Sequence, residues 1–221
     1  MTQVYAPWGM GDVAISTTLI PYLEPPIKWI VNAKNAFLLE GHGFEIVTLE
    51  NILTNDKVKY PNHICPLPWQ NMGLLGNPYA YIPQLAVLNE IKNRNPRPIL
   101  KFQVEEYKRT SDKPLCLLES KAVSFDSMTD EEINRITTLL PNHEIVNVEN
   151  VELKQIPHAY VMADVFIGIS SGISCVCCAY QCPRVRIEYQ RGDKLSCIYM
   201  EPNILRCTTS DELFRRIRGS V

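Results

Sequence analysis

The amino-acid sequence predicts an α/β protein of two small Rossmann-like lobes, each built on a parallel sheet, with a ligand cleft between them. Short apolar segments alternate with amphipathic ones in both halves of the 221-residue chain, as in βαβ units. Glycine or serine turns follow a strand near each end, at 8–13 and at 168–174. A polar stretch with two prolines, NRNPRP at 93–98, separates the halves, so we expect lobes at 1–95 and 96–221.

The first half is predicted to contain parallel strands joined by helices. Each short apolar run fits a buried strand, and each run with helical spacing between two strands fits a crossover helix. Residues 60–83 are rich in Pro, Gly, Asn and aromatic residues, so we expect a loop there, around one short strand. The expected elements are strand 4–6, helix 13–20, strand 28–33, a short helix at 35–43 that stops at Gly41 or Gly43, strand 44–50, strand 63–66 and helix 83–92.

The second half repeats this alternation of strands and helices. Its first helix carries a capping box, because Thr129 is followed three residues later by Glu132. Ser210 is the expected N-cap of the last helix. The expected elements are strand 114–120, helix 129–141, strand 143–149, helix 156–163, strand 164–170, helix 171–181, strand 184–190 and helix 210–219.

The composition is that of an ordinary globular protein, with 46% hydrophobic and 21% charged residues. It argues against disorder, a collagen-like repeat and a coiled coil. A net charge of −2 gives no general signal for nucleic-acid binding, and KNRNPRP and RRIRG are the only basic stretches that hint at it. The N-terminus does not resemble a secretion signal and no long apolar run is present, so we expect a cytoplasmic protein without a membrane span.

Eight cysteines are present, and four of them, within 175–182, form the pattern C-x-C-C-x3-C. Zinc and iron–sulfur sites usually use separated C-x2-C pairs, whereas this cluster lies inside an apolar segment. We therefore expect buried cysteines that pack a helix against a sheet, with a metal or redox role as the alternative. No metal and no cofactor are predicted.

The first strand–turn–helix junction is WGMGDV at 8–13. Glycines after a strand let the backbone turn tightly and approach a ligand, and the following helix presents free N–H groups to an anion. Asp12 lies at the start of that helix. It either caps the helix or faces a ligand, and the short Gly-x-Gly pattern does not decide between the two.

The second junction is GISSGIS at 168–174, where a buried strand ends and a helix begins. N–H groups and the hydroxyls of Ser170 and Ser171 favour a phosphate-binding turn there, because ligands of open α/β sheets bind at the carboxyl ends of the strands. Serines that only cap the helix are the alternative. Glu188 is expected either to contact a nucleotide ribose or to be an ordinary carboxylate at a strand end.

Together, the two junctions resemble those of the lipopolysaccharide heptosyltransferases (ADP-heptose:lipopolysaccharide heptosyltransferase relatives) and related glycosyltransferases of GT-B fold. WGMGDVAISTTLIPYL at 8–23 is similar to the family's strand, Gly-Asp-Val and apolar helix. ADVFIGISSGISCVCCAYQCPRVRI at 163–187 is similar in order and spacing to its Ala-Asp-apolar-apolar-Ile-Gly-x-Asp-Ser-Gly-Pro-x-His signature. Residues 114–132 give weaker support.

The resemblance implies a glycosyltransferase that moves a sugar from a nucleotide-sugar donor to an acceptor hydroxyl, with inversion and without a metal. Asp12 matches the catalytic aspartate and would act as general base. Lys121 would neutralise a phosphate, with a solvated loop lysine as the alternative. Trp8 and Met10 are expected to bind the acceptor. The expected donor-binding residues are Gly11, Ser120, Lys121, Ser170, Ser171, Gly172, Ile173 and Glu188.

The chain departs from the signature at Ser170, Ile173 and Cys175, where the family has Asp, Pro and His. These departures leave open a changed donor, or a non-catalytic module that binds a nucleotide or sugar phosphate. A different α/β enzyme, such as an epimerase or hydrolase, is a third hypothesis. The acceptor is equally open: a saccharide, a lipid, a protein or, for a phage-type enzyme, a modified nucleobase, in a site that a partner chain could complete.

Overall fold

The chain divides into two compact units, Met1–Gln103 and Val104–Val221, and each is described by itself. The predicted boundary near residue 95, and the elements predicted between 60 and 92, lie outside the described residues. The computed structural model describes residues 2–6, 9–49, 97–122, 126–169, 171–180, 183–191 and 204–220.

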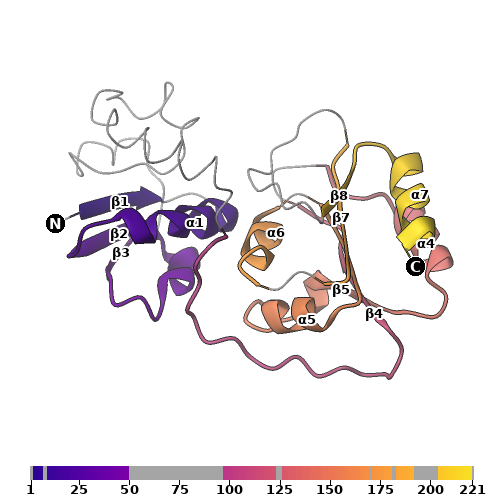
Figure 1. The fold of residues 1–221 in the computed structure, drawn as a ribbon, viewed down its shortest axis with the longest axis horizontal. Helices are drawn as coiled ribbons and strands as arrows, with labels where there is room; N and C mark the ends of the chain where they lie inside the picture. Colours follow the sequence, from indigo (N-terminus) through magenta and orange to yellow (C-terminus); the bar gives the residue numbers. More distant parts are fainter. Residues whose placement is uncertain are drawn as a thin grey trace. The chain divides into compact units, whose positions relative to one another are not determined.

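Unit 1 contains a parallel sheet in the order β1-β2-β3 (Figure 1). Its elements confirm the predicted alternation of strands and helices. The central strand is fully buried at Trp29, Ile30 and Val31, as expected for a strand flanked on both sides. The elements are β1 (Thr2–Ala6), α1 (Met10–Ser16), a 3-10 helix (Thr17–Tyr22), β2 (Ile27–Asn32), a second 3-10 helix (Ala33–Leu39) and β3 (Glu45–Leu49).

The turn before β3 depends on glycine, as the sequence predicted. Gly41 and Gly43 both have positive φ angles, of 78° and 72°. A Cβ on Gly41 would also lie 2.8 Å from the backbone oxygen of Lys101. The segment that contains Lys101, which ends unit 1, therefore packs closely on the rest of that unit, and Ile99 N–H donates to Thr17 Oγ1 over 2.8 Å.

Unit 2 contains a five-stranded parallel sheet in the order β5-β4-β6-β7-β8. The last strand, β8, and the 3-10 helix Val148–Asn150, which replaces the end of the predicted strand 143–149, are absent from the sequence-based expectation, and the other described elements match it. The strands are β4 (Leu115–Glu119), β5 (Glu144–Asn147), β6 (Val165–Ile169), β7 (Val185–Tyr189) and β8 (Ile204–Cys207). The helices are α4 (Asp130–Leu139), α5 (Ile156–Met162), α6 (Gly172–Cys177) and α7 (Ser210–Ser220).

Helices cover both faces of this sheet, with α5 and α6 on one side and α4 and α7 on the other (Figure 1). The alternation of side chains along the strands decides which residue faces which layer. Leu117 and Phe166 belong to the core beneath α5 and α6. Leu118 and Ile167 belong to the core beneath α4 and α7. Both faces are apolar, which explains why these strands read as continuous hydrophobic runs.

The strand order of unit 2 locates its topological switch point. After β4 the chain passes through α4 to β5, and after β6 it passes through α6 to β7, on the opposite face. The two connections therefore leave the carboxyl ends of the neighbouring strands β4 and β6 in opposite directions. In open α/β sheets this arrangement opens the crevice where ligands bind.

The helix caps test two predictions from the sequence. The capping box of α4 is confirmed, because Thr129 Oγ1 accepts from Glu132 N–H and Glu132 Oε2 accepts from Thr129 N–H. The prediction that Ser210 caps α7 is wrong. Thr209 Oγ1 accepts from Glu212 N–H instead, because Glu132 takes the Ser210 hydroxyl. Within the described ranges, no helix is long and apolar enough to cross a membrane.

Candidate functional site

The first candidate centre is Asp12, at the carboxyl end of β1. Gly9 is the N-cap of α1 and donates its N–H to Asp12 Oδ2 over 3.0 Å, so this carboxyl does cap the helix. The side chain is half-buried. Burial raises the pKa of Asp12 above its ordinary value of 3.8, and the hydrogen bond from Gly9 offsets this only in part. A capping carboxyl with a raised pKa is also a stronger base than an exposed aspartate.

The neighbours of Asp12 differ in their exposure to solvent. Gly11 is buried and Met10 is half-buried. Gly9 leaves room for the carboxyl, since a Cβ there would lie 3.4 Å from Asp12 Oδ2. Trp8, the other predicted acceptor residue, lies outside the described residues.

The second candidate centre is the carboxyl edge of β4 and β5 in unit 2. Ser120 is buried, and its Oγ accepts from Asn147 Nδ2 over 2.9 Å. Lys121 is 68% exposed and pairs with Glu149, with 2.9 Å between Nζ and Oε2. Lys121 therefore has a partner, unlike a solvated lysine. The pair is weak, because an exposed ion pair contributes about 0–1 kcal/mol.

The start of α6 brings predicted residues to the end of the neighbouring strand β6. Ser171 is the N-cap of α6, and its Oγ accepts from the N–H groups of Ile173 and Ser174 over 3.1 and 3.2 Å. The N–H of Ile173, which we expected to bind a phosphate, is thus already taken by the serine cap. Gly172 is half-exposed beside it, and Ser170 lies outside the described residues.

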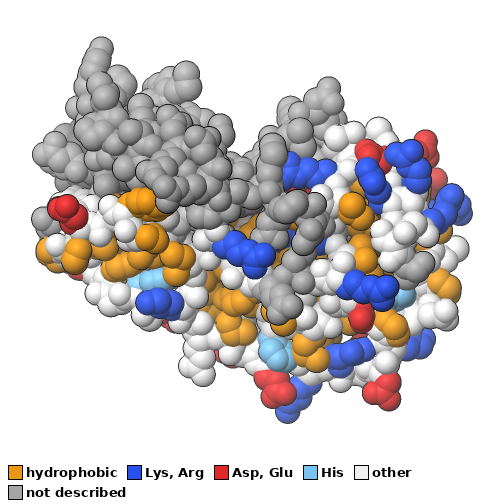
Figure 2. All heavy atoms as spheres, in the orientation of Figure 1, with side chains coloured by type: hydrophobic (Ala, Val, Ile, Leu, Met, Phe, Trp, Pro, Cys, Tyr) orange, Lys and Arg blue, Asp and Glu red, His pale blue; other side chains and the backbone are white. Residues whose placement is uncertain are grey.

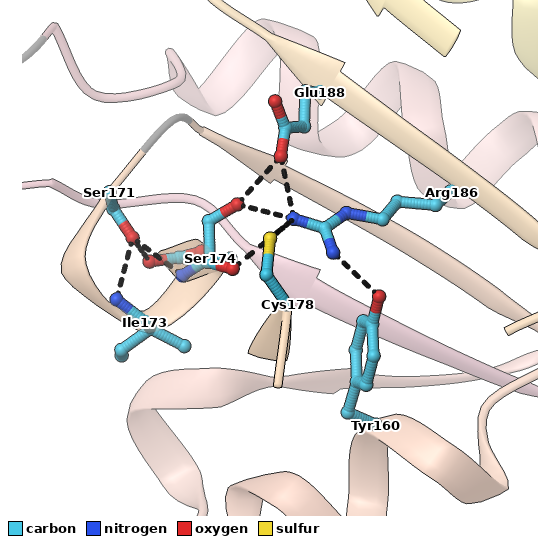
Figure 3. A network of polar contacts seen from close by, with 8 residues as sticks. Tyr160, Ser171, Ile173, Ser174, Cys178, Arg186 and Glu188 are labelled. Carbon is cyan, nitrogen blue, oxygen red and sulfur yellow. Dashed lines mark hydrogen bonds and ion pairs between the residues drawn. The ribbon is translucent and has the colours of Figure 1, made fainter. Parts of the chain in front are cut away.

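Glu188 does not lie at the open edge of the sheet. It is 4% exposed, and its Oε1 accepts from Arg186 Nη2 over 2.6 Å and from Ser174 Oγ over 2.9 Å. In Figure 3 the Arg186 guanidinium lies between the Glu188 carboxyl and the Tyr160 hydroxyl, with Cys178 beside it. This buried network holds β7 to α5 and α6, and contact between Glu188 and a ribose stays a prediction.

One buried carboxyl at the switch point was missed by the sequence reasoning. Glu119, the last residue of β4, is 2% exposed and accepts a hydrogen bond on Oε1 from Ser171 Oγ. Burial raises the pKa of Glu119 to about 8, the Ser171 hydroxyl opposes this, and nearby Glu188 adds to it. The available signal was a single carboxyl at the end of an otherwise apolar strand, PLCLLES.

The cysteines of the described residues are free and buried, as expected for packing. Cys177 is fully buried, and burial raises its pKa well above 9. No group of three or more His, Cys, Asp or Glu side chains that could hold a metal occurs in the part of the chain that the structure describes. Cys182, the last member of the predicted cluster, lies outside that part.

The face of the molecule drawn in Figure 2 shows how the charged side chains of the described residues are distributed. On the side drawn in Figure 2, Lys and Arg side chains of the described residues are scattered among acidic and neutral surface. They form no continuous basic patch there. This agrees with the near-neutral charge balance of the sequence.

Comparison with known proteins relates this geometry to a solved fold. No protein-family model matches the chain, and no curated protein matches it either. Among solved structures, the ADP-heptose lipopolysaccharide heptosyltransferase II of E. coli matches over 99% of this chain and 98% of that chain, with a TM-score of 0.67. The fold is heptosyltransferase-like. The sequence identity is 12%, so the likeness shows the fold alone.

The heptosyltransferase-like fold confirms the resemblance inferred from the motifs at 8–23 and 163–187, and with it the predicted fold class. In each motif a strand is followed by a helix, β1 by α1 and β6 by α6. Asp12 belongs to unit 1, and the edge formed by Ser120, Lys121 and Ser171 belongs to unit 2. The polar side chains of unit 2 meet around its switch point, where the fold favours ligand binding.

Proposed function

We propose that the protein is a glycosyltransferase that moves a sugar from a nucleotide-sugar donor to an acceptor hydroxyl, with inversion and without a metal. The observation that carries the proposal is Asp12, a half-buried carboxyl with a raised pKa at the end of β1 in a heptosyltransferase-like fold. Its Oδ2 accepts from Gly9, which fixes the carboxyl, while Oδ1 receives no hydrogen bond from the described residues. Oδ1 is the atom that would accept the proton of the acceptor hydroxyl.

The donor is proposed to bind at the carboxyl edge of β4 and β6. Its diphosphate carries negative charge, which grows on the leaving nucleoside diphosphate as the bond to the sugar breaks. Lys121 can exchange its exposed partner Glu149 for a phosphate at small cost. Ser171, the N-cap of α6, and Gly172, its first residue, form the start of that helix. Gly11, Ser120, Ser170, Ile173 and Glu188 complete the predicted donor set, and Trp8 and Met10 the predicted acceptor set.

A non-catalytic binding module of the same fold is the competing proposal. It is favoured by Cys175, which stands where the family signature has His and is 8% exposed. A buried thiol at that position offers a ligand no charge and only a weak hydrogen bond. Under this proposal the nucleotide would still bind, but Asp12 would serve only as the cap of α1.

The substitution Asp12→Asn separates the two proposals. Asparagine keeps an oxygen that can accept from Gly9 N–H, but it cannot take a proton from an acceptor. We expect Asp12→Asn to bind nucleoside diphosphates as the wild type does and to lose transfer activity by about 100-fold or more. Binding is measured by isothermal titration, and transfer by release of nucleoside diphosphate from a panel of nucleotide sugars with candidate acceptors.

The matched control is Asp211→Asn, which removes an exposed carboxylate from the first turn of α7. Its activity should equal that of the wild type. Wild-type activity should also fall on the acid side at a pH above 3.8, because Asp12 must be ionised to act as base and its pKa is raised. Full activity in Asp12→Asn refutes the general base, and wild type that binds no nucleotide refutes the donor site.

A further inference from the structure

The carboxyl of Glu119 links the end of β4 to the start of α6 across the switch point. Ser171 Oγ has one proton and two lone pairs. Both lone pairs accept backbone N–H groups, from Ile173 and Ser174. The Ser171 proton must therefore be donated to Glu119 Oε1. This fixes the direction of the relay: Glu119 accepts from Ser171, and Ser171 accepts from the first turn of α6.

The same argument places any proton that Glu119 carries. Because Oε1 is already the acceptor for Ser171, the proton resides on Oε2. That oxygen is buried and has no hydrogen-bond partner among the described residues. It lies over Gly168, where a Cβ would come within 3.2 Å of it. The site is thus shaped for a carboxyl in this position and supplies no donor to the second oxygen.

The surroundings of Glu119 favour the protonated form. In the parallel register, Glu119 is opposite Gly168 and Gly168 is opposite Glu188, so the two carboxyls lie in one row on the same face of the sheet. Arg186 is the one buried cation among the described residues, and it is bonded to Glu188. One cation neutralises one carboxylate, and the other carboxyl must keep its proton to stay neutral.

Other ionisable groups packed around this face do not supply a second cation. From α6 come Cys177 and Cys178, and from α5 comes Tyr160, whose hydroxyl accepts from Arg186. Lys121, just beyond β4, is exposed and pairs with Glu149. If Glu119 ionises, the sheet holds a buried carboxylate without its own countercharge, beside a second carboxylate.

We propose that Glu119 is a positioning residue of the donor site, whose neutral carboxyl accepts from Ser171 and holds the start of α6 for the nucleoside diphosphate without adding a negative charge beside it. This inference rests on the proposed function, because it names a residue that controls the same site. Ionisation of Glu119 keeps the hydrogen bond from Ser171, because a carboxylate is the better acceptor, but it adds a second buried negative charge beside the start of α6 and so weakens binding of the anionic nucleotide. The raised pKa of Glu119, about 8, places this loss on the alkaline side of neutrality.

The experiment compares wild type with Glu119→Gln and Glu119→Ala. Glutamine keeps an oxygen that accepts from Ser171 and an N–H in place of the proton on Oε2, but it cannot ionise. ADP, GDP, UDP and CDP are titrated calorimetrically into each protein between pH 7 and pH 9.5. We expect wild-type affinity to fall by about tenfold between pH 7 and pH 9, since one pH unit beyond a pKa leaves about a tenth of the protonated form. Glu119→Gln should bind equally at all these pH values, and Glu119→Ala weakly at all of them.

Hydrogen exchange in the ligand-free protein tests the relay separately. The amides of Ile173 and Ser174 should be as protected in the wild type as in Glu119→Gln between pH 7 and pH 9, and should lose protection in Glu119→Ala, which cannot accept from Ser171. An equal fall of affinity in wild type and Glu119→Gln would overturn the inference while leaving the donor site intact. If the wild type binds no nucleotide even at pH 7, the proposed function fails. The exchange data then decide: loss of protection in Glu119→Ala alone supports the relay, and equal protection in all three proteins overturns it.

Discussion

Two buried glutamates on opposite faces of the same sheet have opposite environments. Glu132, on the α4 and α7 side, is 5% exposed and accepts five hydrogen bonds. Glu119, on the α5 and α6 side, is 2% exposed and accepts one from the described residues, Ser171. Both side chains are largely buried, and Glu119 is the more deeply buried of the two, so the opposite direction of their pKa shifts reflects the hydrogen bonds that Glu132 receives.

The partners decide the charge of each group. Burial opposes ionisation of Glu132, but hydrogen bonds from Ser210, Tyr189 and Thr129 outweigh it and lower the pKa of Glu132 to about 2. Glu119 lacks such donors, and burial raises its pKa to about 8. A carboxylate whose oxygens are all hydrogen-bonded stabilises the fold. A buried carboxyl oxygen that lacks a partner among the described residues lowers the stability of the fold. Such destabilising groups are expected mainly at functional sites.

Glu132→Gln should be the most damaging of the substitutions that probe this comparison. An amide cannot serve as acceptor for all five donors, so the variant should lose about 3 kcal/mol of unfolding free energy at pH 7, the value of a shift from 4.5 to about 2. Since the folded pKa is depressed, the wild type should lose this stability as pH falls from about 4.5 toward 2. Urea unfolding at pH 7 and at pH 3 measures both effects.

The control for this prediction is Glu131→Gln, on the exposed side of the same first turn of α4. It should change the stability by less than about 0.5 kcal/mol. If Glu131→Gln and Glu132→Gln are equally stable at pH 7, the hydrogen bonds to Glu132 contribute nothing, and the contrast with Glu119 has no energetic basis.

Gly168→Ala should have the next largest effect, because the added methyl group would crowd Glu119 and Phe166. A Cβ at this position would lie 2.6 Å from two ring carbons of Phe166 and 3.2 Å from Glu119 Oε2. The Phe166 ring packs edge-on against Tyr160 and beneath Arg186, so it has little freedom to move. We expect a loss of about 1–3 kcal/mol, measured by thermal and urea unfolding.

Gly219→Ala is the matched control for that substitution. Nothing lies within 4 Å of a Cβ built at Gly219, which is in α7. Alanine is also the better helix former, so stability should be unchanged or rise by up to about 1 kcal/mol. A loss of similar size at both glycines would mean that crowding at Gly168 is not the cause.

The sequence predicted the strands and helices well where the pattern is local. Apolar runs with period two or 3.6 gave the described elements except the short 3-10 helix Val148–Asn150 and β8, whose four residues, ILRC, are too short and mixed to give a clear pattern. The cap of α4 was also predictable, since Thr129 and Glu132 are three residues apart. The cap of α7 was not, because Thr208, Thr209 and Ser210 are all suitable and Glu132, distant in sequence, takes the Ser210 hydroxyl.

The candidate site was predictable in its location but not in its bonding. Glycine and serine after apolar strands indicated both junctions, while the bond between Glu119 and Ser171 joins residues 52 apart in the sequence. The ion pair of Arg186 and Glu188 could have been inferred, since residues two apart in a strand share a face. Whether Arg186 neutralises Glu188 or Glu119 depends on its position in the folded sheet, where it bonds to Glu188.

Thr129→Ala should have the smallest effect. It removes one of the five hydrogen bonds that Glu132 accepts. Thr129 Oγ1 accepts from Glu132 N–H over 3.2 Å and donates to Glu132 Oε2 over 3.1 Å. Its loss should cost about 1 kcal/mol, as for other N-caps, because four donors to Glu132 remain. Thr137→Ala is the control: this exposed hydroxyl bonds back to Ile133 O, so alanine should not destabilise α4. A much larger loss at Thr129 in urea unfolding would mean that the bonds around Glu132 act as one cooperative network, in which each donor depends on the rest.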